Sequence, residues 1–147
     1  MLYEGRCHCG SIGYSYRTER LPKDWSIRAC QCSFCRAHGA RTTSDPCGSV
    51  EYAIERPEQL QRYRFGLQVT EFLICRGCGV YIGAVTEVSS ALLAVVNVNV
   101  LHPRPTDLPD ALSVSHDGES IAARNRRRQS AWTPCCEIVE RVRASAR

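Results

Sequence analysis

The amino-acid sequence predicts an all-β domain with a few short helices, held together by bound metal. Short segments that alternate apolar and polar residues recur through the first two-thirds of the chain, with turn residues between them. Seven of the ten cysteines fall into three tight clusters, and closely spaced thiols favour zinc. A length of 147 residues fits a single domain with one modest core.

Several segments have the apolar and β-branched pattern of strands. Glycine, proline or a cysteine cluster bounds most of them, which is typical of short strands joined by turns. The expected strands span residues 12–17, 49–55, 60–65, 69–74, 80–85 and 92–101.

Helical features are short. A single turn is expected at residues 57–60, and residues 117–120 offer an N-cap for a helix over 121–128. Residues 134–147 are expected to be a frayed end, although Ile138, Val139 and Val142 allow a weak amphipathic helix. Three prolines within residues 103–109 predict a loop.

The formal charge of +4 is concentrated at the C-terminal end. Residues 1–123 carry 12 basic and 13 acidic side chains, whereas residues 124–147 carry 7 arginines and 2 glutamates. We therefore expect one domain over residues 1–134 and a basic tail over 135–147. The body is not basic and Trp132 is the only aromatic residue near these arginines, so a solvated arginine-rich helix is favoured over nucleic-acid binding.

Neither a signal peptide nor an apolar run long enough to cross a membrane is apparent in the sequence. The expected location is the reducing cytoplasm, with no role at a membrane. Thiols in that compartment bind metal more readily than they form disulfides.

Two of the clusters, Cys7-x-Cys9 and Cys75-x-x-Cys78, run directly into a glycine. Such a chain turns sharply so that backbone N–H groups point at the sulfurs, and glycine tolerates the positive φ that this needs. Together these residues, the four-cysteine group, would form a closed and therefore structural zinc site.

The remaining cluster, Cys30, Cys32 and Cys35, is here called the three-cysteine group. Three thiolates can hold one zinc ion and leave its fourth position free for a substrate thiol. The net charge of −1 makes such a zinc a weak Lewis acid, so thiol chemistry suits it better than water activation. Two alternatives are a second closed site completed by Cys47 and a redox-active cluster without metal.

Arg36 and Arg41 follow the three-cysteine group directly. They are candidates to bind a carboxylate of a peptide-like cosubstrate, or else are exposed basic side chains. His8 and His38 flank cysteine clusters, and a role outside the metal ligand sets is favoured for both.

The cysteine-bearing segments resemble one known family. The matching runs are GRCHCG at 5–10, CQCSFCR at 30–36 and FLICRGCG at 72–79, and segments at 117–120, 126–128 and 132–134 resemble the C-terminal end of many members. In this order they resemble the glutathione-dependent formaldehyde-activating enzyme (GFA) family, which shares its domain with the globular part of centromere protein V.

The resemblance implies a zinc-stapled β-tent fold. It also implies structural zinc at the four-cysteine group (Cys7, Cys9, Cys75 and Cys78) and catalytic zinc at the three-cysteine group (Cys30, Cys32 and Cys35). The implied activity is that of a carbon–sulfur lyase that joins glutathione, or a similar thiol, to formaldehyde or a related small aldehyde. The alternative is a non-catalytic zinc-stabilised module that binds protein or nucleic acid.

Overall fold

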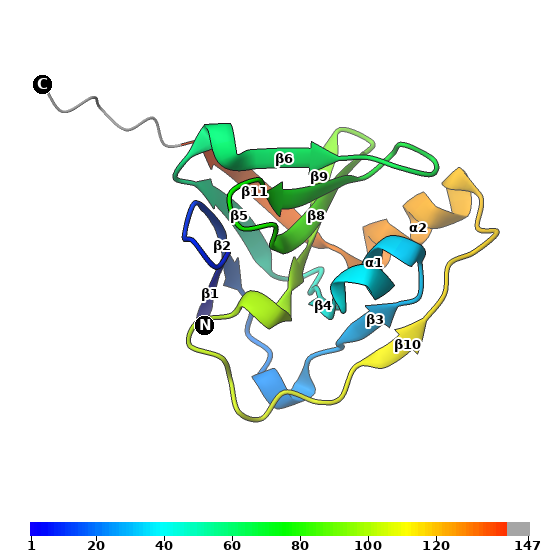
Figure 1. Cartoon of the computed structure of the whole chain (residues 1–147). Coiled ribbons are helices and arrows are strands. Elements are labelled where there is room, and N and C mark those ends of the chain that lie inside the picture. The colour runs from blue at the N-terminus through cyan, green and yellow to red at the C-terminus, as the bar shows by residue number, and fades with distance from the viewer. Residues whose placement is uncertain (141–147) are drawn as a thin grey trace, which may run out of the picture.

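The computed structural model describes residues 1–140 and confirms the all-β class (Figure 1). Its elements in chain order are β1 (Leu2–Arg6), β2 (Ile12–Arg17), η1 (Pro22–Asp24), β3 (Arg28–Cys30), α1 (Ser33–His38), β4 (Thr42–Thr43), β5 (Ser49–Ile54), η2 (Pro57–Gln59), β6 (Leu60–Tyr63), β7 (Glu71–Cys75), β8 (Tyr81–Val88), β9 (Ala91–Asn97), η3 (Val98–Val100), β10 (Leu112–Val114), α2 (Ile121–Ala131) and β11 (Thr133–Glu140). No helix in this part of the chain is long and apolar enough to cross a membrane.

The strands form two sheets that share β11. In the first sheet β1, β2 and β5 are antiparallel neighbours, and β11 lies parallel to β5. In the second sheet β6, β7, β8 and β9 are successive antiparallel neighbours, and β4, β3 and β10 extend it beyond β9. The first two residues of β11 pair with β9, so this strand connects both sheets.

The C-terminal segment differs from the expectation. Over residues 133–140 it is a strand, neither the frayed end nor the weak helix expected from residue 134 onward, and residues 141–147 lie outside the described part of the chain. Apolar residues at 138 and 139 fit either structure by local pattern, but the exposed edge of β5 offers backbone partners only to a strand. The expected domain boundary after residue 134 falls within β11.

Most of the other expected strands are present with ends shifted by a few residues. The strand expected over 92–101 ends at Asn97, because the chain turns there into η3. The Asn97 side chain accepts a hydrogen bond from the backbone N–H of Asn99 at 3.2 Å and donates to the carbonyl of Tyr81 at 2.9 Å. This buried amide therefore fixes the end of β9 against β8.

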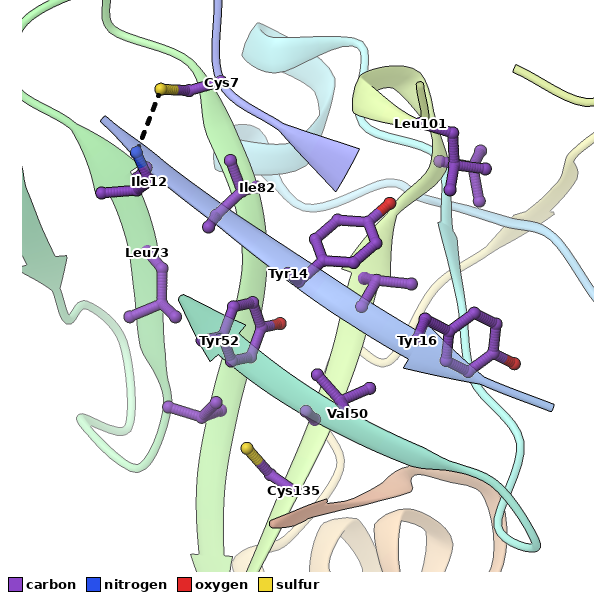
Figure 2. Close-up of a cluster of buried hydrophobic side chains, with 14 of the residues drawn as sticks. Cys7, Ile12, Tyr14, Tyr16, Val50, Tyr52, Leu73, Ile82, Leu101 and Cys135 are labelled. Carbon is purple, nitrogen blue, oxygen red and sulfur yellow. Dashed lines mark hydrogen bonds between the residues drawn. The ribbon is translucent and has the colours of Figure 1, made fainter. Parts of the chain in front are cut away.

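The main core lies between the two sheets. Figure 2 shows the side chains of Tyr14 and Tyr52, from β2 and β5, near Leu73 and Ile82, from β7 and β8. Both tyrosine rings are buried and meet edge to face, with centroids 6.3 Å apart. Their hydroxyls donate to backbone carbonyls of the second sheet, so both buried phenols are paired.

A second, smaller core lies on the opposite face of β8 and β9. It contains Tyr81, Leu93, Val95 and Trp132, with residues of α1 packed against them. Strands β8 and β9 are thus buried on both faces, which explains their almost continuous apolar sequence. Helices α1 and α2 lie at this end of the molecule, near β3 and β10 (Figure 1).

Candidate metal centres

The four-cysteine group comes together where two tight turns meet. Cys7 follows β1 in the turn that leads to β2, and Cys75 ends β7 before the turn that leads to β8. All four sulfurs lie within 4.8 Å of one another. The Cys9 sulfur lies 3.7 Å from that of Cys7 and 3.5 Å from that of Cys75, across 66 residues of sequence.

The two turns are built alike. The N–H of Cys7 donates to the carbonyl of Ile12, and the N–H of Cys75 donates to the carbonyl of Val80, which closes each loop. The glycines that follow Cys9 and Cys78 have φ angles of 79° and 77°, a left-handed conformation that favours glycine. The positive φ expected from the Cys-Gly pairs is confirmed.

The four sulfurs fit zinc in number, type and spacing. A tetrahedral zinc–thiolate site with bonds of about 2.3 Å places its sulfurs roughly 3.8 Å apart, close to the two distances found here. Burial raises the pKa of the Cys75 thiol to about 12, whereas hydrogen bonds from Ser11 lower the pKa of Cys9 to about 6. A buried thiol such as Cys75 becomes a thiolate at neutral pH when a cation replaces its proton.

The three-cysteine group lies at the junction of β3 and α1. Cys30 ends β3, Cys32 is the N-cap of α1, and Cys35 lies in its first turn. The Cys32 sulfur accepts a hydrogen bond from the backbone N–H of Cys35 at 3.4 Å. The three sulfurs lie within 4.8 Å of one another, because a short helix that begins at Cys32 folds the chain back on itself.

These three thiols cannot all ionise without a cation beside them. The neighbouring Cys35 thiol lowers the pKa of Cys30 to about 5, while that interaction and burial raise the pKa of Cys35. A divalent cation removes this conflict, so the donor set fits zinc as well as the four-cysteine group does.

No fourth protein ligand accompanies the three-cysteine group among residues 1–140. Cys47, which the sequence left as a candidate to complete it, is exposed and belongs to neither group. His8 and His38 also lie outside both groups; the ring of His38 packs on Phe34, with centroids 4.5 Å apart. A metal ion in this group would therefore have a free position.

A cavity of about 400 Å³ borders the three-cysteine group. One wall is apolar and includes Phe65, Leu67, Phe72, Val95 and Trp132. The rest of the lining, here called the polar wall, is formed mainly by residues of β3 and of the segment 116–128, and its Arg128 stacks on Trp132. The cavity is large enough for a small-molecule ligand that reaches the cysteine sulfurs.

The arginines on the cavity wall are not the two singled out in the sequence. Arg36 is exposed on α1, and Arg41 donates through Nε to Oδ1 of Asn99 at 2.8 Å; neither lines the cavity. The cavity arginines come from β3 and α2. Sequence composition suggested a solvated α2, yet Arg128 in its last turn is buried. The run at residues 126–128 in the family resemblance was the feature that could have pointed to it.

Comparison with known proteins places this geometry in context. The family model described as glutathione-dependent formaldehyde-activating enzyme matches residues 2–114, which include both cysteine groups. The crystal structure of a Rhodobacter sphaeroides protein is similar to this chain, with 31% sequence identity and a TM-score of 0.54 over 76% of this chain and 99% of that chain. A search of curated proteins finds no match.

The family match spans most of the chain, and both of its cysteine groups have the donors and spacing that zinc requires. This protein therefore belongs to the glutathione-dependent formaldehyde-activating enzyme family.

Proposed function

We propose that the protein joins a thiol of the glutathione type to formaldehyde or a related small aldehyde at the three-cysteine group. The observation that carries this proposal is a set of three converging thiols, with no fourth protein ligand among residues 1–140, at the edge of a cavity of about 400 Å³. A purely structural site needs no such opening.

In this proposal Cys30, Cys32 and Cys35 hold a zinc ion as thiolates. When bound there, zinc supplies a fourth position at which a substrate thiol is stabilised as its thiolate. The apolar wall around Phe72 and Trp132 orients the rest of the thiol and limits the access of water.

The reaction is an addition that needs no oxidant or reductant. The thiolate sulfur attacks the carbonyl carbon of the aldehyde and forms the carbon–sulfur bond, while the electron pair of the C=O π bond moves to oxygen. The oxygen then takes up one proton, which balances the proton lost by the thiol. With formaldehyde and glutathione the product is S-hydroxymethylglutathione, and the reverse reaction is carbon–sulfur cleavage.

The four-cysteine group has a different role in the proposal. It holds a second zinc ion that stabilises the contact between the β1–β2 and β7–β8 turns and takes no part in the reaction. All ten cysteines are free thiols in the structure, in keeping with the proposed location in a reducing cytoplasm.

The test is the exchange rate between free and thiol-bound formaldehyde, measured by NMR with ¹³C-formaldehyde and glutathione. The uncatalysed exchange is the baseline. The wild-type protein is expected to accelerate exchange, Cys32→Ser to abolish the acceleration, and Cys47→Ser, an exposed cysteine outside both groups, to retain it. A zinc-loaded wild-type protein that leaves the exchange at its baseline would contradict the enzymatic proposal and favour a binding module.

A further inference from the structure

The polar wall of the cavity carries more positive than negative charge. Four arginines and two carboxylates line it. The arginines are Arg28, Arg124, Arg127 and Arg128, and the carboxylates are Asp117 and Glu119. A zinc ion held by three thiolates would contribute a single negative charge, so the cavity would keep an excess positive charge beside that metal.

Two of the arginines already have an acidic partner. The guanidinium of Arg127 donates to both carboxylate oxygens of Glu119 at 3.0 Å, and Nε of Arg124 lies 3.5 Å from the same carboxylate. Glu119, just before α2, therefore offsets one of the two positive charges in this part of the wall.

Arg128 has no such partner. Its side chain is on the inner face of α2 and the residue is only 4% exposed. Its guanidinium stacks on the ring of Trp132 at 4.5 Å, and one terminal nitrogen lies 3.4 Å from the hydroxyl of Thr86. Its Nε makes no hydrogen bond, and no carboxylate of residues 1–140 lies within ion-pair distance.

Arg28 faces the same cavity from β3. It donates to the hydroxyl of Ser44 at 2.6 Å, and that hydroxyl donates in turn to the carbonyl of Ala131. No ion pair to Arg28 is present among residues 1–140. Arg128 is buried and Arg28 is half-buried. Burying a charged group without a counter-charge is unfavourable, so these two arginines without an ion pair at one cavity indicate that an anion completes the site.

We propose that Arg28 and Arg128 bind the carboxylate of the substrate, whose other end reaches the three-cysteine group. The thiol end of this assignment rests on the proposed function, whereas the carboxylate end rests on the two arginines. The substrate class is then a thiol that carries a carboxylate, with its carbon chain against the apolar wall. Arg28 lies within residues 2–114, which the family model matches, whereas Arg128 lies beyond them, so only part of the proposed anion site falls inside that match.

The first test uses a pair of thiols that differ only in charge, 3-mercaptopropionate and 3-mercaptopropionamide. Each is titrated into cobalt-substituted protein, and binding is read from the thiolate-to-cobalt absorption. The wild-type protein is expected to bind the acid about tenfold or more tightly than the amide, because a charge-assisted hydrogen bond is lost with the amide. Arg128→Gln should reduce the ratio of the two affinities to near one without weakening binding of the amide. Arg126→Gln, at an exposed position on the same helix, should preserve the ratio.

A second pair without a thiol separates the two proposals. Binding of 3-phenylpropionate and of its amide to the zinc protein is measured by calorimetry. Tighter binding of the acid than of the amide, abolished by Arg128→Gln, would support the anion site. If at the same time neither thiol changed the cobalt spectrum, that second result would contradict only the proposed function. Equal binding of acid and amide in both pairs would overturn the anion site and leave the thiol chemistry untouched.

Because Arg128 is buried, two further variants test the anion site without depending on the folding of Arg128→Gln. Arg28→Gln tests the same preference from β3 if Arg128→Gln does not fold, and Arg128→Lys is expected to restore part of the acid preference because it keeps the charge. If Arg28→Gln weakens acid and amide by the same factor, the arginines serve as counter-charges for the metal centre and the carboxylate assignment is wrong.

Discussion

At the scale of single residues, burial and hydrogen bonding set the chemistry of each thiol. Cys75 is fully buried and has a raised pKa, whereas Cys9 is exposed and its hydrogen bonds from Ser11 lower its pKa. The two sulfurs nevertheless lie 3.5 Å apart. A cation that binds both removes the cost of leaving a thiolate at the buried position, so metal binding and folding are coupled at Cys75.

Replacing Cys75 with serine should therefore unfold the domain. Structural zinc contributes on the order of 10 kcal/mol of binding energy, comparable with the roughly 5–15 kcal/mol of net stability of a typical domain. Cys75→Ser is expected to lose zinc and its cooperative thermal transition, measured by elemental analysis and circular dichroism. Cys136→Ser, at an exposed cysteine outside both groups, is the control and should behave as wild type. A Cys75→Ser protein that melts cooperatively would show that the four-cysteine group does not hold the fold.

Cys32 has two roles that substitution can separate. Its sulfur is a proposed metal ligand and also caps α1 by accepting the N–H of Cys35. Serine can still cap a helix, but alanine cannot, and a lost cap costs about 1 kcal/mol.

Both Cys32→Ser and Cys32→Ala should thus lose one zinc ion per chain and keep a cooperative transition. Cys32→Ala should be the less stable of the two by about 1 kcal/mol, as measured by chemical denaturation. Retention of both zinc ions in both variants would mean that Cys32 is not a ligand.

At the scale of elements, β8 is the strand on which the core depends most. It is buried on both faces, and Gly83 in its middle lies under the hydroxyl of Tyr52. A Cβ atom at Gly83 would overlap that hydroxyl and would lie 2.5 Å from the carbonyl oxygen of Val95. The Tyr52 hydroxyl donates to that same carbonyl at 2.7 Å, so the missing side chain makes room for this hydrogen bond.

Gly83→Ala is expected to lower the free energy of unfolding by about 1–3 kcal/mol, the usual cost of overpacking a core. Tyr52→Phe alone should cost about 1 kcal/mol through its lost hydrogen bond. The double variant should lose less stability than the sum of the two single losses, because the phenylalanine ring no longer presents the hydroxyl that overlaps the new Cβ atom. If the two losses measured by denaturant titration add strictly, the new Cβ atom clashes with the Val95 carbonyl alone and not with the Tyr52 hydroxyl.

Elements with a strong local pattern could be predicted from the sequence, and elements defined by distant partners could not. The strand at residues 12–17 alternates cleanly and matches β2. Strands β3 and β10 have three residues each and pair in parallel with each other across about eighty residues of sequence, and β3 also pairs with β4. Such short segments carry too little periodicity to be recognised before their partner is known.

At the scale of the whole molecule, the C-terminal segment is the part that sequence reasoning misread. Helix α2 is rich in arginine, and the expected solvated helix describes all of it except Arg128, its one buried residue. Packing places Arg128 on Trp132 and at the cavity, and β11 then joins the two sheets, which the local sequence pattern does not reveal. The three cysteine clusters, by contrast, were evident from spacing, because zinc ligands in one tight turn are close in sequence as well as in space. The pairing of Cys7 and Cys9 with Cys75 and Cys78 spans 66 residues, and only the glycine that follows each pair and the family resemblance pointed to it.

We propose that the chain holds two metal centres, one closed and one with a free position. The most direct test is zinc-edge X-ray absorption combined with elemental analysis on freshly purified protein, with and without glutathione. We expect two zinc ions per chain and a gain in the average number of sulfur neighbours when glutathione is added. A single zinc ion with four sulfur neighbours that does not respond to glutathione would contradict the account and leave a zinc-stabilised β domain without a thiol site.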